Sequence, residues 1–151
     1  MLLLVPDAHD RGRAGLLRVL EGRGCIAGPA RPWLSVRASY DRALRAHEAG
    51  LVGDTEVHLA RLVLTADADA LADLRARALA PLAELRPAVA EKLTDTLRSW
   101  LLHHGRREDV AAALFVHPQT VRYRMGQLRE IFGDGLDDPD TVLELTIALS
   151  A

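Results

Sequence analysis

Side chains that can hydrogen-bond the edges of nucleic-acid bases gather on one face of a helix predicted over residues 117–132. At about 100° per residue, this face carries an amide, a phenol, a second amide at its edge and a glycine that leaves room for close approach. These residues are Gln119, Tyr123, Gln127 and Gly126. The chemistry that this face predicts is recognition of base edges in the major groove of DNA.

Basic and hydroxyl side chains flank this face at positions suited to phosphate contacts. Arg122 and Arg124 fall on its two flanks, with Thr120 beside Arg124. We expect Arg122 to face the groove with the amides and the phenol, and we expect Thr120 and Arg124 to contact phosphate. His117 and Arg107 are expected to contact phosphate as well.

Two helices joined by a tight turn must position these side chains. The first is predicted over residues 107–114, in which Ala111 is small enough to let the second helix cross at close range. His117-Pro118 begins the second helix, because proline is tolerated where the backbone N–H has no partner within the helix. Phe115 occupies a turn position that is often glycine. The apolar stripe expected to face the core consists of Val121, Met125, Leu128 and Phe132, with Ile131 at its margin.

Further helices are expected on both sides of this pair. Pro81 and Pro87 interrupt helical segments, so a helix is predicted over residues 88–104 and ended by Gly105. Its leucine stripe is Leu93, Leu97 and Leu101, which predicts intrachain core, with a dimer interface as the alternative. Earlier, Asp67 or Asp69 can begin a helix. A last helix is expected after Asp138-Pro139, in which the aspartate caps and the proline starts the first turn.

The charge distribution favours an anionic partner for this region alone. The chain of 151 residues has a formal net charge of −2. Residues 98–132 carry six arginines against three acidic residues, whereas residues 133–151 carry five acidic residues and no basic one. The positive field is therefore local, and two copies acting together would strengthen DNA binding.

The N-terminal part has an α/β pattern. Strands are predicted over residues 1–8 and 25–30, and helices over residues 14–23 and 35–49, the second of them ended by Gly50. The single cysteine, Cys25, excludes an intrachain disulfide and is expected to be a buried apolar residue. A small sheet of this kind exposes an edge that can pair with another copy, which favours a dimer.

Catalysis, metal binding and membrane insertion are not predicted. His103 and His104 lie at a helix end without an identifiable nucleophile or carboxylate partner. The acidic run at residues 133–140 lacks the ligand rhythm of a calcium loop, and no cofactor motif occurs. Neither a secretory signal nor a membrane span is visible, so we expect a cytoplasmic protein. Because no catalytic partners can be identified, we do not expect an enzyme.

The C-terminal residues resemble the helix-turn-helix of the PucR/CdaR-type transcriptional regulators. The matching strings are LTDTLRSWLLHHG, VAAALFVHPQTVRYRMGQLREIFG and LDDPDTVLELTIAL, at residues 93–105, 110–133 and 136–149. The family commonly has asparagine where this chain has Gln119, which bears on base preference. The resemblance implies double-stranded DNA as partner.

A second resemblance concerns residues 1–66, whose strand and helix order and string SVRASYDRALRAHEAG resemble the later half of a degenerate GGDEF-like domain. No GGDEF string occurs, so nucleotide cyclisation is not expected. The fold class predicted is α+β, a truncated α/β remnant at residues 1–66 followed by an all-α helix-turn-helix bundle. Residues 67–87 are expected to be a helical linker and residues 88–151 the DNA-binding domain.

The sequence thus predicts a sequence-specific transcriptional regulator that inserts helix 117–132 into the major groove as a homodimer. The alternative is a dimerisation or protein-interaction module of a truncated regulator that does not itself bind DNA. An unidentified small-molecule effector is a further partner that the sequence leaves open.

Overall fold

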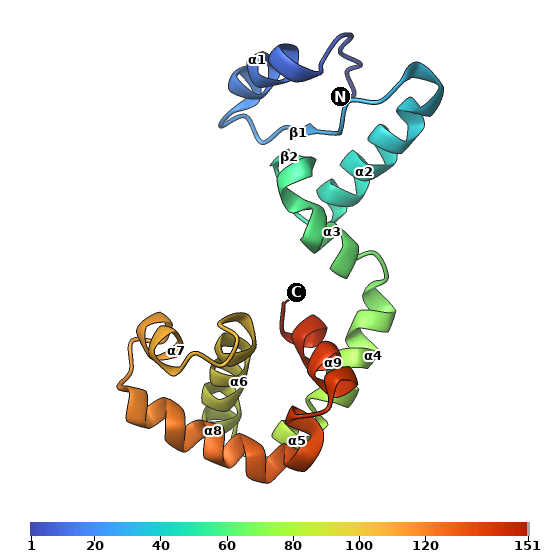
Figure 1. Ribbon diagram of the computed structural model, residues 1–151. Coiled ribbons are helices and arrows are strands. Elements are labelled where there is room, and N and C mark those ends of the chain that lie inside the picture. The colour runs from blue at the N-terminus through green and yellow to red at the C-terminus, as the bar shows by residue number, and fades with distance from the viewer. Residues whose placement is uncertain (151) are drawn as a thin grey trace. The chain divides into compact units, whose positions relative to one another are not determined.

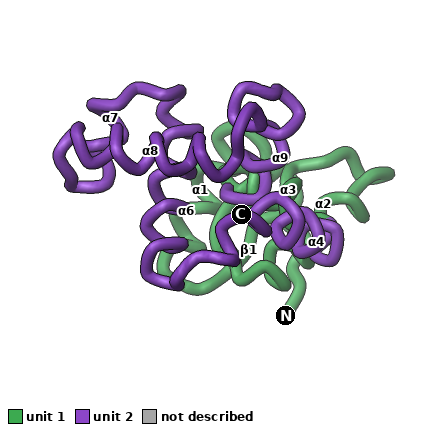
Figure 2. The backbone as a smooth tube through the Cα atoms, turned by 90° about the horizontal axis from the view of Figure 1, so that it is seen from below, with its two compact units in different colours: residues 1–66 green, residues 67–151 purple. Residues whose placement is uncertain are grey.

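The computed structural model describes residues 1–150, and its chain divides into two units, Met1–Ala66 and Asp67–Ala151 (Figure 2). Helices account for 71% of the structure, and the sheet has only two strands. The all-helical part that the sequence predicts is therefore present, whereas the α/β part is reduced to a minimal sheet.

The first unit consists of short elements around two parallel strands (Figure 1). In chain order they are α1 (Asp10–Leu20), β1 (Ile26–Ala27), a 3-10 turn (Trp33–Ser35), α2 (Val36–Glu48), β2 (Gly53–Asp54), a second 3-10 turn (Thr55–His58) and α3 (Leu59–Leu64). Ile26 pairs with Gly53, and Ala27 pairs with Asp54. The helix predicted over residues 35–49 is confirmed, and Gly50 follows it with a φ of +68°.

Two sequence expectations for this unit are wrong. Residues 1–8, predicted to form a buried strand because of their apolar run, form no strand, and residues 1–7 are exposed. Such a run becomes a strand only when a neighbouring strand accepts its hydrogen bonds, and the described sheet holds β1 and β2 alone. Cys25 is exposed as well, because it lies just before the two-residue β1 and not within a covered strand.

Arg13 fastens α1 to the sheet. Its Nε–H donates to Asp54 Oδ2 at 3.1 Å, its Nη1–H donates to the Gly28 carbonyl at 3.0 Å, and a third donor reaches Asp54 Oδ1. Both side chains are largely buried, at 13% and 15% exposure. Thr55 adds a buried link, since its hydroxyl donates to the Ala27 carbonyl at 3.1 Å. These hydrogen bonds link α1, β1 and the segment that begins at β2.

We expect the stability of the first unit to decline in acid because of Asp54. Partial burial raises the pKa of this carboxyl, but hydrogen bonds from Arg13 and the Glu56 backbone N–H, with the positive charges of Arg13 and His58, hold the pKa below the ordinary value of 3.8. A folded-state pKa below the unfolded one contributes stability above pH 3.8, which is lost as the pH falls through the folded pKa.

Hydrogen exchange at the Gly53 amide, which donates to the Cys25 carbonyl, reports this loss. Exchange protection should fall with acid in the unaltered protein and should depend less on pH in the Asp54→Asn variant. The same pH slope in both proteins would contradict the assignment.

The second unit is all helical. It contains α4 (Ala68–Ala78), α5 (Ala80–Ala83), α6 (Pro87–Leu102), α7 (Arg107–Ala113), α8 (Pro118–Phe132), a 3-10 turn (Gly133–Leu136) and α9 (Pro139–Ser150). Two aspartates cap helices as the sequence predicts. Asp67 Oδ1 accepts the Ala70 N–H at 2.9 Å, and Asp138 Oδ2 accepts the Thr141 N–H at 2.8 Å.

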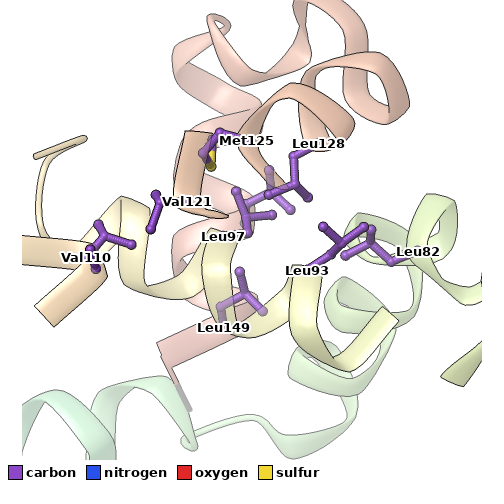
Figure 3. Close-up of a cluster of buried hydrophobic side chains, with 10 residues drawn as sticks. Leu82, Leu93, Leu97, Val110, Val121, Met125, Leu128 and Leu149 are labelled. Carbon is purple, nitrogen blue, oxygen red and sulfur yellow. The ribbon is translucent and has the colours of Figure 1, made fainter. Parts of the chain in front are cut away.

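The core of this unit lies between α6, α8 and α9, with α5 and α7 at its margins (Figure 3). Leu93 and Leu97 are at most 2% exposed, and Leu101 packs against the same cluster. The leucine stripe is therefore intrachain core, and the alternative that it forms a dimer interface is wrong. The other buried members are Leu82, Val110, Ala111, Val121, Met125, Leu128, Leu145 and Leu149.

Residues 67–87 pack within the second unit. Leu82 belongs to the core, and α4 lies along α9. Arg75 Nε–H donates to the Ala148 carbonyl at 3.0 Å, and Arg77 pairs with Glu144 at 2.6 Å. The segment expected to be a linker thus contacts the last helix of the chain.

Within residues 1–150, none of the helices combines the length and the apolar character needed to cross a membrane.

Candidate nucleic-acid interface

The helix pair α7 and α8 matches the two helices expected over residues 107–114 and 117–132 to within a residue at each end. Val110 is fully buried and Ala111 is 3% exposed. The small side chain of Ala111 lets the backbones of the two helices approach, as the sequence predicts. A residue with a long side chain at this position would separate α7 from α8.

The turn between them ends in a histidine cap. Val116 N–H donates to the Ala111 carbonyl at 3.0 Å and closes the turn. His117 Nδ1 accepts the Gln119 N–H at 3.2 Å, and Pro118 is the first residue of α8. His117 therefore caps the N-terminal end of α8. This role uses Nδ1 and directs the ring toward the N-terminal end of α8.

Phe115 has an unusual conformation within this turn. Its φ is +53° and its side chain is 96% exposed. A positive φ favours glycine, since a Cβ is crowded there. The turn therefore has the geometry that its usual glycine would give, but it carries an aromatic side chain.

The two faces of α8 differ as the sequence predicts. Val121, Met125 and Leu128 are at most 2% exposed and pack into the core. Of the eight residues expected to contact DNA, those exposed are Arg107, His117, Gln119, Arg122 and Tyr123, and those half-buried are Thr120, Arg124 and Gln127. We call the surface formed by Gln119, Arg122, Tyr123, Gly126 and Gln127 the polar face of α8.

Gly126 lies in the middle of this polar face. A Cβ built there would meet nothing within 4 Å, so the free protein does not require glycine at this position. Glycine inside a helix costs about 1 kcal/mol of stability relative to alanine. The absence of a side chain is therefore unfavourable for the fold and leaves room for something outside it.

Arg124 links α8 to α6. Its Nη1–H donates to Thr96 Oγ1 at 3.2 Å, and the buried Thr96 hydroxyl donates to the Lys92 carbonyl at 2.7 Å. Arg124 stands three residues after the buried Val121, which brings its stem toward the neighbouring helix. Sequence reasoning missed Thr96, because a hydroxyl inside a helix gives no local signal of a partner elsewhere.

Two further arginines of the α7 and α8 region have partners within the chain. Arg106 pairs with Asp109 at 2.8 Å, and the Arg129 guanidinium lies over the Trp100 ring at 5.9 Å. Gly105 lies against that ring as well, with a φ of +73° and a Cβ position only 3.2 Å from Trp100. Arg107 and Arg122 are exposed and supply positive charge beside and on the polar face.

His103 and His104, the residues considered for catalysis, lie at the C-terminal end of α6. His103 Nδ1 lies 2.8 Å from the Ser99 carbonyl within its own helix. Among residues 1–150, no three or more histidine, cysteine, aspartate or glutamate residues group in a way that could hold a metal ion. The surface of α8 described above is a polar helix face with positive charge at its flanks.

Comparison with known proteins agrees with this geometry. The family described as the PucR C-terminal helix-turn-helix domain matches residues 93–151. An uncharacterised protein of the pkwA 5′ region of Thermomonospora curvata is 34% identical over 98% of this chain, which covers 85% of that protein.

Two longer proteins match as well. The purine catabolism regulatory protein of Bacillus subtilis is 37% identical over 39% of this chain, which covers 11% of that protein. An uncharacterised protein of Mycobacterium bovis is 31% identical over 88% of this chain, which covers 33% of that protein. No solved structure matches the chain significantly.

Proposed function

The chain belongs to the same family as the Thermomonospora curvata protein and carries a PucR C-terminal helix-turn-helix domain, and on this premise we propose that it is a DNA-binding transcriptional regulator. The observation that carries the proposal is the division of α8 into a buried apolar stripe and a polar face that is exposed at Gln119, Arg122 and Tyr123. A helix held by one side on a core can present its other side to the major groove.

The contacts proposed divide into two classes. Gln119, Arg122, Tyr123 and Gln127 face the groove, where amide and guanidinium groups can each bond two atoms of a base edge. The residues proposed to contact phosphate are Arg107, His117, Thr120 and Arg124. For Arg124 this is a second role beside its bond to Thr96, and a guanidinium has five N–H donors to share.

We propose that the protein binds double-stranded DNA as a homodimer. Residues 98–132 carry a net charge of only +3, which gives one copy few phosphate contacts. Two copies on two half-sites double those contacts.

The first unit, in which α2 connects the parallel strands β1 and β2, is proposed to be the remnant of a GGDEF-like domain.

Selection of bound DNA from a random pool tests the proposal. Affinity for the selected site should fall with salt, and log K should decrease linearly with log salt at a slope of about −0.9 per phosphate contacted. The mass of the protein in solution, alone and with DNA, reports the dimer. Absence of enrichment, or binding that does not depend on salt, would contradict DNA recognition.

A further inference from the structure

We propose that Phe115 makes an apolar contact with DNA beside the polar face of α8. This inference rests on the proposed function and adds to it an uncharged anchor in the turn that precedes the recognition helix. The chemistry that Phe115 offers is an aromatic surface, which fits either a thymine methyl group or the carbon atoms of a deoxyribose.

Nothing in the free protein accounts for a phenylalanine at this position. Leu114 and Val116, on either side, pack against the core, whereas the Phe115 side chain is 96% exposed. Its φ of +53° is unfavourable for a bulky residue. Among residues 1–150, the other non-glycine residues with positive φ are Asp7, Asp10 and His104, types that enter this region more readily.

Phe115 therefore lowers stability, since glycine would relieve the strained backbone. Strained conformations of this kind cluster at binding and active sites. Covering an exposed aromatic side chain with a binding partner lowers the free energy of the complex. The free protein bears a cost that a complex would offset.

The position of Phe115 and the surrounding charge favour DNA as that partner. Phe115 stands two residues before His117, the cap of the N-terminal end of α8, and Gln119 lies in the first turn of that helix. The turn separates the exposed Arg107 of α7 from the exposed Arg122 of α8. An aromatic ring in this setting is positioned to meet a polyanion that the arginines attract.

The test is Phe115→Gly, measured for both stability and DNA binding. The variant should melt about 4–8 °C higher, because glycine suits the positive φ. It should bind the selected site about tenfold more weakly, which corresponds to the burial of part of one aromatic side chain. Because phenylalanine carries no charge, the slope of log K against log salt should not change.

Deoxyuridine distinguishes the two sources of apolar contact. Replacing thymidine by deoxyuridine at single positions of the DNA site removes one methyl group at a time. If Phe115 contacts a methyl group, one such replacement should weaken binding by the wild-type protein and leave binding by Phe115→Gly unchanged. If Phe115 contacts deoxyribose, each replacement should affect the two proteins equally, while Phe115→Gly remains the weaker binder.

Leu143→Ala is the matched control, because Leu143 is a 58% exposed apolar residue on α9. It should leave DNA affinity unchanged. Wild-type affinity in Phe115→Gly would overturn this proposal. If Arg122→Ala weakens binding in that case, the DNA-binding function stands without Phe115. Absence of salt-dependent binding by the wild-type protein would overturn both.

Discussion

Replacing Arg122, Tyr123 and Arg124 together by alanine is expected to weaken binding to the selected DNA site by about 100-fold or more. Arg122 and Tyr123 are exposed on the polar face, and each good base contact contributes about 1–3 kcal/mol. The slope of log K against log salt should become shallower by about 1 for each arginine that contacts phosphate. Fluorescence anisotropy of labelled DNA across a salt series measures both quantities.

Two controls separate lost contacts from a disturbed fold. Arg86→Ala removes one exposed arginine just before α6 and should change affinity little. Thr96→Val keeps Arg124 but removes the hydroxyl that accepts its Nη1–H bond. If Thr96→Val alone weakens DNA binding, the hydrogen bond from Arg124 to Thr96 holds α8 in the position that binding requires. Unchanged affinity in the triple variant would eliminate the proposed function.

Leu97→Ala should lower the free energy of unfolding of the second unit by about 2–5 kcal/mol. Leu97 is fully buried where α6 meets the core, and truncation removes apolar contacts and leaves a cavity. That loss is a large fraction of the roughly 5–15 kcal/mol by which a domain is stable. DNA binding by this variant should fail under conditions in which the second unit unfolds, because α8 is then no longer packed on the core.

Urea unfolding followed by Trp100 fluorescence measures the change, because Trp100 packs against this core. A Trp33→Phe background removes the other tryptophan, which is 74% exposed in the first unit. Leu102→Ala is the control, since Leu102 lies on the same helix and is 51% exposed. A similar change in both variants would contradict the assignment of Leu97 to the core.

The helix pair and its buried stripe follow from local rules. Proline at the start of α8 and apolar residues at three- and four-residue spacing define its bounds and its inner face. The caps at Asp67 and Asp138 depend on residues only three positions further along the chain. Local rules of this kind do not depend on the rest of the fold, and these predictions are confirmed.

Features that depend on distant residues could not be predicted. Arg124 and Thr96 are 28 positions apart, and Arg75 bonds a carbonyl 73 positions away. The apolar residues 1–5 meet the local criteria for a strand, but a strand requires a partner that no local pattern identifies. The exposure of Cys25 has the same origin, because burial within a sheet depends on what covers it.

Gly126 gives stability and recognition opposite preferences at one position. Because a Cβ there meets nothing in the free protein, alanine would strengthen α8, yet in the proposed complex with DNA its methyl group would stand between the helix and the groove. In a library selected for survival of heating, alanine should accumulate at residue 126. In one selected for binding to the DNA site, glycine should persist.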